Sequence, residues 1–292
     1  MNILTVDLED WFQVSNLEGR VPREAWSHCE FRLGRNTDRV LAMLDEAGAK
    51  ATFFVLGWNA EQCPSLVRRI ADAGHEIATH GWEHRLVYDM KPGEFREDLR
   101  RSIGVIEDAA GVRVKGHRAA SFSITEQCLW ALEILVSEGI AYDSSMFPIR
   151  HGRYGVSSRW MEGRDVITDS GSIVEVPITV WSAMGVNVPF AGGGYFRLLP
   201  YGVVRWITRA MNRAGRRVVF YFHPWEIDSG IPRIKLGLGM GLRSYANIAA
   251  NARKFSALLK EFKFVPVREA LRHDDLPVRT LRHASGERWL LV

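Results

Sequence analysis

The sequence predicts an α/β fold, a distorted (β/α) barrel of about seven parallel strands. One observation is that short apolar runs alternate with amphipathic helices, which indicates βαβ units and a parallel sheet. Another is that helix after helix ends in a small residue followed by glycine, as in DEAGAKATFFVLG and NRAGRRVVFYFHP. Glycine suits the left-handed turn that stops a helix. No G-x-G-x-x-G follows a strand, which disfavours a Rossmann arrangement.

Each expected strand is a short apolar run of the kind that is buried on both faces of a parallel sheet. In chain order these runs are ILTVD, ATFFVLG, HEIATHG, VKGHRA, AYDSS and VVFYFHP. The helical period predicts helices over residues 37–47, 64–73, 92–109, 125–138, 201–214 and 245–262. Two further stretches, 147–196 and 228–242, break the alternation, and only SIVEVPITV in the first resembles a strand. We expect both to be insertions at the C-terminal face of the barrel.

The bulk properties fit one domain over residues 1–292, because no linker or shift in composition divides the chain. The net charge of +4 is dispersed, which disfavours a nucleic-acid partner. The three cysteines, Cys29, Cys63 and Cys128, are too far apart to suggest a disulfide framework or a thiolate metal site.

The chain shows no secretory signal pattern and no run of about 20 apolar residues. We therefore expect a soluble cytoplasmic protein without a transmembrane segment. The oligomeric state is left open.

The candidate metal ligands follow from the strand ends, because chemistry in a (β/α) barrel lies at the carboxyl ends of the strands. His80 and His84, in THGWEH, are four residues apart, which on a helical turn places both imidazoles on one face. On the first strand, Asp7 and Glu9 point the same way and Asp10 points away. Two histidines and one carboxylate leave positions open for water and substrate, as catalytic metal sites do.

Three other strand ends carry charged side chains. Arg118 can bind and orient a carboxylate through two hydrogen bonds. Asp143 can hold His223 in one tautomer and raise its pKa, which would suit His223 to act as a general acid. Each residue alone would be read as a surface ion pair or a core residue. Their shared position at strand ends favours a common site.

The motifs TVDLED, THGWEH, GHRAASF, YDSS and FYFHP, in that order, resemble the polysaccharide deacetylase family, which is carbohydrate esterase family 4 and includes the nodulation-deacetylase homology domain. The resemblance spans roughly residues 3 to 270 and is strongest to the branch found in bacterial exopolysaccharide loci. It implies a single catalytic domain over residues 1–292 with the C-terminal extension of that branch over about 147–292. It implies that Asp7 is the catalytic base and that Glu9, with Asp10 as a rival, binds the metal together with His80 and His84. It further implies that Arg118 orients the base and that His223, with Asp143 as its partner, is the general acid.

Three positions depart from the family pattern. Leu8 stands where many members have the metal-binding acid, Gly81 replaces a serine or threonine, and Ala120 replaces a proline. The last change weakens the expectation that a backbone N–H near Ser121 faces the oxyanion. The family implies one divalent ion, for which zinc is expected and cobalt, nickel or iron are compatible.

Several aromatic residues flank these motifs, and flat rings suit the faces of sugars. Packing of the barrel rim is an equal alternative for each of them. With Ser121, the expected substrate-binding residues are Trp11, Trp82, Phe122 and Trp225, and Phe12 lies beside the first of them.

The expected function is therefore a metal-dependent hydrolase that removes N-acetyl groups from amino sugars of an exopolysaccharide or its lipid-linked precursor. Asp7 would take a proton from water, and His223 would protonate the leaving amine. One alternative is an allantoinase-like hydrolase of a small amide, which the intact His80 and His84 disfavour. The other is an inactive glycan-binding barrel, which the intact Asp7, Arg118 and His223 disfavour.

Overall fold

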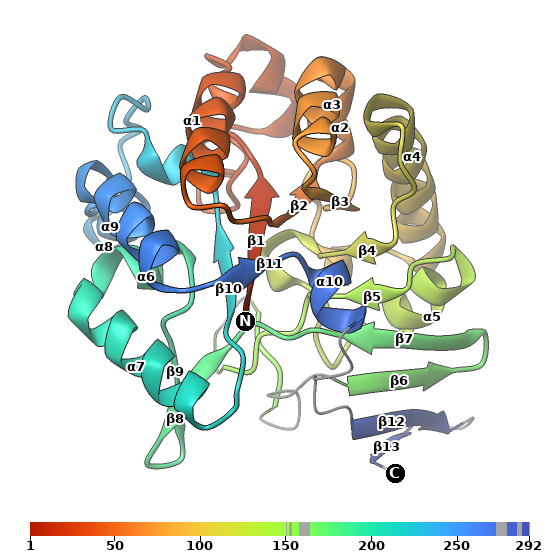
Figure 1. The fold of residues 1–292 in the computed structure, drawn as a ribbon. Helices are drawn as coiled ribbons and strands as arrows, with labels where there is room; N and C mark the ends of the chain where they lie inside the picture. The colour runs from red at the N-terminus through yellow and green to blue at the C-terminus, as the bar shows by residue number, and fades with distance from the viewer. Residues whose placement is uncertain (150, 152–153, 158–163, 273–278, 285–287, 292) are drawn as a thin grey trace.

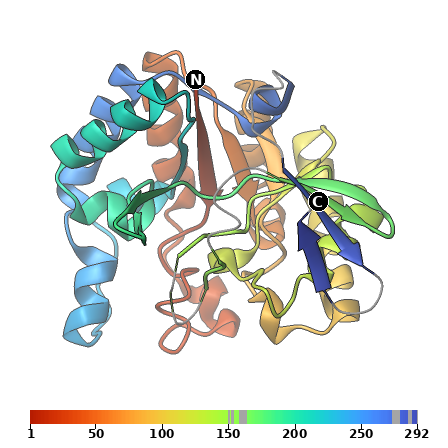
Figure 2. The same ribbon diagram turned by 90° about the horizontal axis from the view of Figure 1, so that it is seen from below.

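The computed structural model describes residues 1–149, 151, 154–157, 164–272, 279–284 and 288–291. Seven parallel strands lie side by side and curl into a half-barrel with helices on its outer face (Figures 1 and 2). In spatial order they are β10 (Val219–Phe222), β1 (Asn2–Leu8), β2 (Thr52–Val55), β3 (Glu76–Thr79), β4 (Gly116–His117), β5 (Tyr142–Asp143) and β7 (Gly171–Glu175). The predicted distorted (β/α) barrel is confirmed.

The predicted helices are present and end close to the expected residues. They are α1 (Leu33–Glu46), α3 (Pro64–Asp72), α4 (Pro92–Ala110), α5 (Trp130–Ser137), α7 (Tyr201–Arg213) and α9 (Ile248–Glu261). The five glycines that the sequence places after helices have left-handed φ values between 60° and 81°. They are Gly48, Gly74, Gly111, Gly139 and Gly215. Helix α5 starts later than predicted because a 3₁₀ turn and loop precede it.

Four short helices were not predicted. They are α2 (Gly57–Gln62), α6 (Gly193–Leu198), α8 (Leu238–Tyr245) and α10 (Val267–Arg272). None of the helices that the structure describes is long and apolar enough to cross a membrane.

Strand β1 lies between β10 and β2 and is buried along its whole length. Its even-numbered side chains, Leu4, Val6 and Leu8, belong to the core beneath the helices. Because side chains alternate along a strand, Thr5 and Asp7 face the barrel interior. This alternation brings one ionisable residue of β1 to the interior at the end of the strand.

The insertion over 147–196 contains more strand than the sequence suggested. It supplies β6 (Arg164–Thr168), antiparallel to β7, and the hairpin of β8 (Val180–Ala183) and β9 (Val186–Pro189). From the end of the chain, β12 (Arg279–Ala284) and β13 (Arg288–Leu291) extend the sheet beyond β6, and β11 (Phe264–Val265) pairs with the start of β1.

The half-barrel is not closed by strand pairing between β7 and β10 in the part of the chain that the structure describes. Single hydrogen bonds bridge this side instead. The Val219 N–H donates to Thr179 Oγ1 at 2.8 Å, and the Tyr221 N–H donates to the Ala191 carbonyl at 3.0 Å. The segment between β7 and β10 therefore covers the open side of the half-barrel.

Candidate active site

A pocket opens at the carboxyl ends of β1, β3, β4 and β10, with an empty volume of about 800 Å³ including its mouth. One wall carries residues singled out in the sequence: Asp7, Glu9, His80, His84, Ser121, Phe122, His223 and Trp225. The opposite wall comes from the second half of the chain and includes His151, Tyr154, Gly193, Gly194, Arg197 and Ser244.

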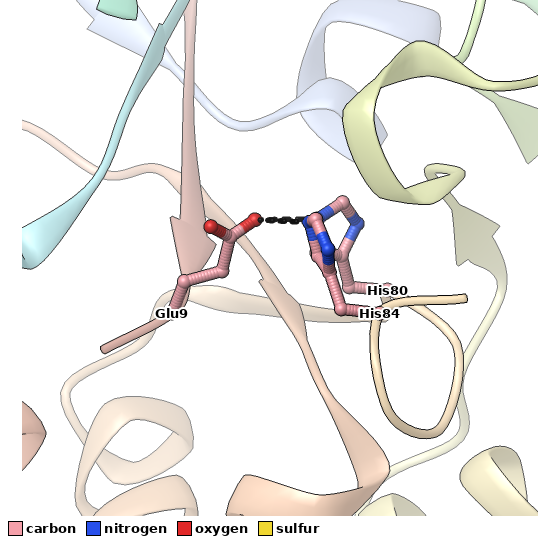
Figure 3. Close-up of side chains that lie close together, drawn as sticks. All are labelled: Glu9, His80 and His84. Carbon is pink, nitrogen blue, oxygen red and sulfur yellow. Dashed lines mark hydrogen bonds and ion pairs between the residues drawn. The ribbon is translucent and has the colours of Figure 1, made fainter. Parts of the chain in front are cut away.

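A buried carboxylate and two imidazoles meet at one end of the pocket (Figure 3). Glu9 Oε1 lies 2.9 Å from His80 Nε2 and 3.1 Å from His84 Nε2. Burial alone would raise the pKa of Glu9. The charges of His84 and His223 and the hydrogen bonds from both nearby imidazoles outweigh burial and hold that pKa well below its ordinary value.

The chemistry of this cluster fits a divalent metal ion. His80 Nδ1 lies 2.7 Å from the Arg118 carbonyl, which can only accept, so Nδ1 carries a hydrogen. The other ring nitrogen then faces a second acceptor, the Glu9 carboxylate. Either a second proton on the ring or a cation between the two groups satisfies that arrangement. The three ligand atoms lie within 4.8 Å of one another, and two imidazoles with one carboxylate form a typical donor set for zinc.

The two histidines converge through a loop, and the predicted helical turn is wrong. His80 follows β3 directly, and residues 80–84 contain no helix. Gly81 has φ 77° and His84 has φ 59°, both left-handed, so the chain turns back and brings the two rings to a centroid distance of 5.5 Å. The glycine at position 81 has a physical reason, because a side chain there would be strained at this φ and would approach Asp98.

Asp10, the rival ligand, lies outside the pocket. Its Oδ2 accepts hydrogen bonds from the backbone N–H groups of Arg32 and Leu33, at 2.6 and 2.8 Å, at the start of α1. Its Oδ1 accepts from the Trp11 N–H at 2.8 Å. Asp10 therefore caps a helix. Only Glu9 of the two acids meets the histidines.

Asp7 is held by Arg118, a side chain with no exposed surface. Arg118 Nη1 donates to Asp7 Oδ1 at 2.6 Å and to Thr5 Oγ1 at 2.8 Å. Its other nitrogens donate to the carbonyl and hydroxyl of Ser144, at 3.1 and 2.8 Å. A guanidinium fixed on three sides holds the carboxylate in one orientation. The second oxygen of Asp7 faces His223 Nε2 at 3.7 Å.

His223 has a partner other than the predicted one. Its Nδ1 lies 2.9 Å from Oε1 of Glu226, which is buried and follows three residues later in a 3₁₀ turn. Burial lowers the pKa of His223, but the charge of Glu9, the hydrogen bond and charge of Glu226, and the charge of Asp7 raise it to about 9. The Glu226 contact fixes Nδ1 as the protonated nitrogen and leaves Nε2 toward the pocket.

Asp143 does not contact His223, so the predicted pairing is wrong. Asp143 Oδ1 lies 2.6 Å from His117 Nδ1 and accepts the Ser145 hydroxyl at 2.8 Å. The physical reason is strand order: β5 pairs with β4 and places Asp143 beside His117, whereas β10 lies beyond β1 on the far side of β2 and β3. Asp143 is a buried structural acid behind the pocket.

The predicted aromatic residues divide into two groups. Phe122 and Trp225 line the pocket together with Ser121, and the Trp225 ring stacks beside His223 at 5.6 Å. Trp11 and Trp82 do not line it, and their predicted sugar-binding role is corrected. Trp11 packs edge-on against Phe12 and donates to the Glu30 carbonyl, and Trp82 lies beneath the Arg101 guanidinium at 3.5 Å.

The sequence analysis missed several pocket residues, among them Glu226, Ser15 and Arg197. Glu226 could have been predicted, because it lies three residues after a histidine at a strand end and this spacing permits a local contact. Ser15 Oγ lies 3.4 Å from His84 Nδ1 and 2.7 Å from Ser121 Oγ, and nothing in its loop marks it. Arg197 lies within 3.9 Å of Glu226 Oε1 and over the Trp225 ring, and only the tertiary fold brings it there.

The fold and the pocket define a class of protein: a (β/α) half-barrel with a buried Glu–His–His cluster, an Arg-held aspartate and a Glu-held histidine at the carboxyl ends of its strands. Residues 30–135 match the family model described as polysaccharide deacetylase, and residues 144–272 match a second model described as a domain of unknown function. Residues 30–135 are thus similar to the polysaccharide deacetylase family, the family that the motifs of the sequence resemble.

Known relatives are similar in sequence to this chain over part of their length. A peptidoglycan-N-acetylglucosamine deacetylase from Bacillus cereus is 36% identical over 98 residues, which are 33% of this chain and 36% of that protein. A chitooligosaccharide deacetylase from a Bradyrhizobium strain is 29% identical over 105 residues, 36% of this chain and 46% of that protein. The chain thus matches about a third to a half of the length of these relatives.

Solved structures share the fold at low identity. A protein from Mycobacterium smegmatis described as a polysaccharide deacetylase has a TM-score of 0.57 at 20% identity, covering 93% of this chain and 90% of that one. An allantoinase has a TM-score of 0.58 at 14% identity, covering 93% and 89%. A family pseudoenzyme from Bacillus anthracis has a TM-score of 0.51 at 15% identity, covering 97% and 69%. The fold alone therefore does not separate these activities.

Proposed function

We propose that this protein is a metal-dependent deacetylase that hydrolyses the acetamide groups of N-acetylated sugars in a glycan or its lipid-linked precursor. The observation that carries the proposal is the meeting of three units in one pocket: the cluster of Glu9, His80 and His84, the Asp7–Arg118 pair, and the His223–Glu226 pair. Amide hydrolysis needs a base for water and an acid for the leaving amine, and the last two pairs supply them.

Glu9, His80 and His84 would hold the divalent ion, with zinc as the expected metal. When bound, the ion supplies Lewis acidity that polarises the amide carbonyl and lowers the pKa of water. The Arg118 carbonyl orients His80 through Nδ1, as partners of metal-binding histidines commonly do.

Asp7 acts as the base and takes a proton from the attacking water. Its Oδ1 is occupied by Arg118, so Oδ2, on the side of His223 and the pocket, is the oxygen that receives the proton. Ser121 lies on the pocket wall with a left-handed φ of 50°, and its backbone N–H is the candidate donor to the developing oxyanion.

His223 acts as the acid and donates the proton on Nε2 to the leaving nitrogen. Burial lowers its pKa, and the charge of Glu9, the hydrogen bond and charge of Glu226, and the charge of Asp7 raise it. The contribution of Glu226 does not depend on Glu9 and favours the protonated form of His223. An amine leaves poorly unless it is protonated, so this step contributes a factor of about 10² to 10⁴ in rate. Phe122 and Trp225 line the same pocket and present ring surface for the sugar.

The two alternative functions can be told apart from deacetylation by their products. An allantoinase-like enzyme would open a cyclic amide, and an inactive barrel would bind glycan without turnover. The test incubates zinc-loaded protein with N-acetylglucosamine oligomers and, separately, with allantoin. The proposal expects acetate and free amine in equal amounts from the oligomers and no ring opening of allantoin. Oligomers left intact by the loaded protein, or ring opening of allantoin, would contradict it.

Glu226→Gln is expected to move the alkaline limb of the pH–rate profile to lower pH. Glu226 raises the pKa of His223 through a hydrogen bond and a negative charge, and the acid form of His223 is lost as pH rises through that pKa. The amide of glutamine keeps the size but not the charge. Asp143→Asn is the matched comparison, because Asp143 contacts His117 and should leave the limb in place. A shift with Asp143→Asn and none with Glu226→Gln would restore the original pairing.

A further inference from the structure

An apolar surface beside the pocket has no role in the proposed chemistry. It consists of Met184, Val186 and Val188 on the β8–β9 hairpin and Val203 and Trp206 on α7, and we call it the hairpin patch. Met184 is fully exposed, Val186 is 62% exposed and Trp206 is 59% exposed. Trp206 and Trp181 of β8 meet edge-on at 5.4 Å, and the hairpin and α7 lie side by side in Figures 1 and 2. The patch is therefore one continuous surface.

The charge near the patch is mostly positive. Residues 176–225 contain six arginines and no aspartate or glutamate, and Arg197 is the one of them that is buried at the pocket. On α7, Arg205, Arg209 and Arg213 recur every four residues along its exposed side. Glu261 of α9 pairs with Arg209 at 2.6 Å. Among the described residues, no carboxylate pairs with Arg205, Arg213 or Arg216.

We propose that the hairpin patch docks on the surface of an anionic lipid bilayer. Tryptophan, methionine and valine would enter the headgroup region, and the arginines around them would meet lipid phosphates. A second copy of the chain is a poor occupant, since it would bring two arginine-rich surfaces together. Nucleic acid would match the arginines but not the exposed Met184, Val186 and Trp206.

The patch is joined to the wall of the pocket. Asn187 of β9 donates to the Pro148 carbonyl at 2.7 Å, and the loop after Pro148 carries the pocket residue Tyr154. From the end of β9 the chain runs within a few residues to Gly193, also on the pocket wall. If the proposed deacetylase function holds, docking would present the pocket to a glycan carried on a lipid, which favours the precursor as substrate.

The test is co-sedimentation of the full chain with vesicles of phosphatidylcholine, alone or mixed with phosphatidylglycerol. The expected result is binding to the mixed vesicles only, weakened by salt. Arg205→Gln with Arg213→Gln should reduce the binding constant about 30-fold. Met184→Ser, Val186→Ser and Trp206→Ser together should reduce it more than about tenfold.

Matched controls lie on the opposite side of the molecule, around α3, α4 and β4. Arg68→Gln with Lys115→Gln removes the same charge, and Val112→Ser removes an exposed apolar side chain. Both control proteins should bind like the wild type. The Asp7→Asn protein should also bind the vesicles like the wild type, because Asp7 has a role only in the proposed chemistry. A failure of docking can then be told apart from a failure of that chemistry. Thermal melts check that each variant is folded.

Four outcomes would overturn the proposal, three of them in the vesicle assay. The wild type fails to sediment with anionic vesicles, the patch variants bind as well as the wild type, or the control variants lose as much binding as the patch variants. Duplex DNA that binds more tightly than the vesicles, and competes with them, would make the surface a nucleic-acid site and the proposal wrong.

Discussion

Asp7→Asn is expected to lose about 10² to 10⁴ in kcat on an N-acetylated sugar while it keeps one equivalent of metal. The asparagine oxygen can still accept the hydrogen bond from Arg118, but the amide cannot take a proton from water. Because Asp7 lies beside the cluster without contributing to it, metal binding should persist. The measurement is the acetate release rate together with the metal content of the purified protein.

Asp10→Asn is the matched control for this change. It makes the same substitution three residues later, at a side chain that caps α1 and lies outside the pocket. We expect near-normal turnover from Asp10→Asn, with a lower free energy of unfolding. Near-normal turnover from metal-loaded Asp7→Asn would show that another group is the base.

His80→Ala is expected to abolish both metal binding and acetate release. It removes one of two imidazole donors, and His80 Nδ1 also links the cluster to the Arg118 carbonyl. Changes to groups that merely orient a ligand cost about 10- to 100-fold in metal affinity, so removal of the ligand should cost more. Equilibrium dialysis with zinc measures the loss, and a thermal melt of the metal-free proteins checks folding.

Two comparisons make this result interpretable. Glu9→Gln changes another expected ligand and should also weaken metal binding. Asp10→Asn should bind one equivalent of metal. His117→Ala removes a buried histidine close by that bonds to Asp143, away from the cluster, and should keep its metal if it folds. A His80→Ala protein that retains stoichiometric zinc would show that the ligand set is wrong.

The fold could be predicted because its signals are local. Glycines after helices and apolar runs between them fix the order of elements, and all five such glycines adopt the left-handed conformation. The hairpin of β8 and β9 was not foreseen as a separate sheet, because an uncharged stretch with scattered glycine and proline carries no clear period.

The site could be predicted as far as residues share a strand or a loop. Asp7, Glu9, His80 and His84 follow from strand ends and spacing. The partner of His223 could not be predicted in this way, because Asp143 also ends a strand and the sequence does not tell which strand ends are neighbours. In the sheet, β5 lies beside β4, and a 3₁₀ turn brings Glu226 to His223 locally. The cytoplasmic location stays a prediction.

The most direct test of the central claim is a metal titration followed by acetate release. The protein is stripped with a chelator, zinc is returned in steps, and acetate release from N-acetylglucosamine oligomers is measured at each step. We expect a negligible rate without metal, a linear rise, and a plateau at one equivalent bound by Glu9, His80 and His84, whereas Glu9→Gln needs much more zinc. Full acetate release from the stripped protein, or a rate that zinc does not restore in the wild type, would contradict the account.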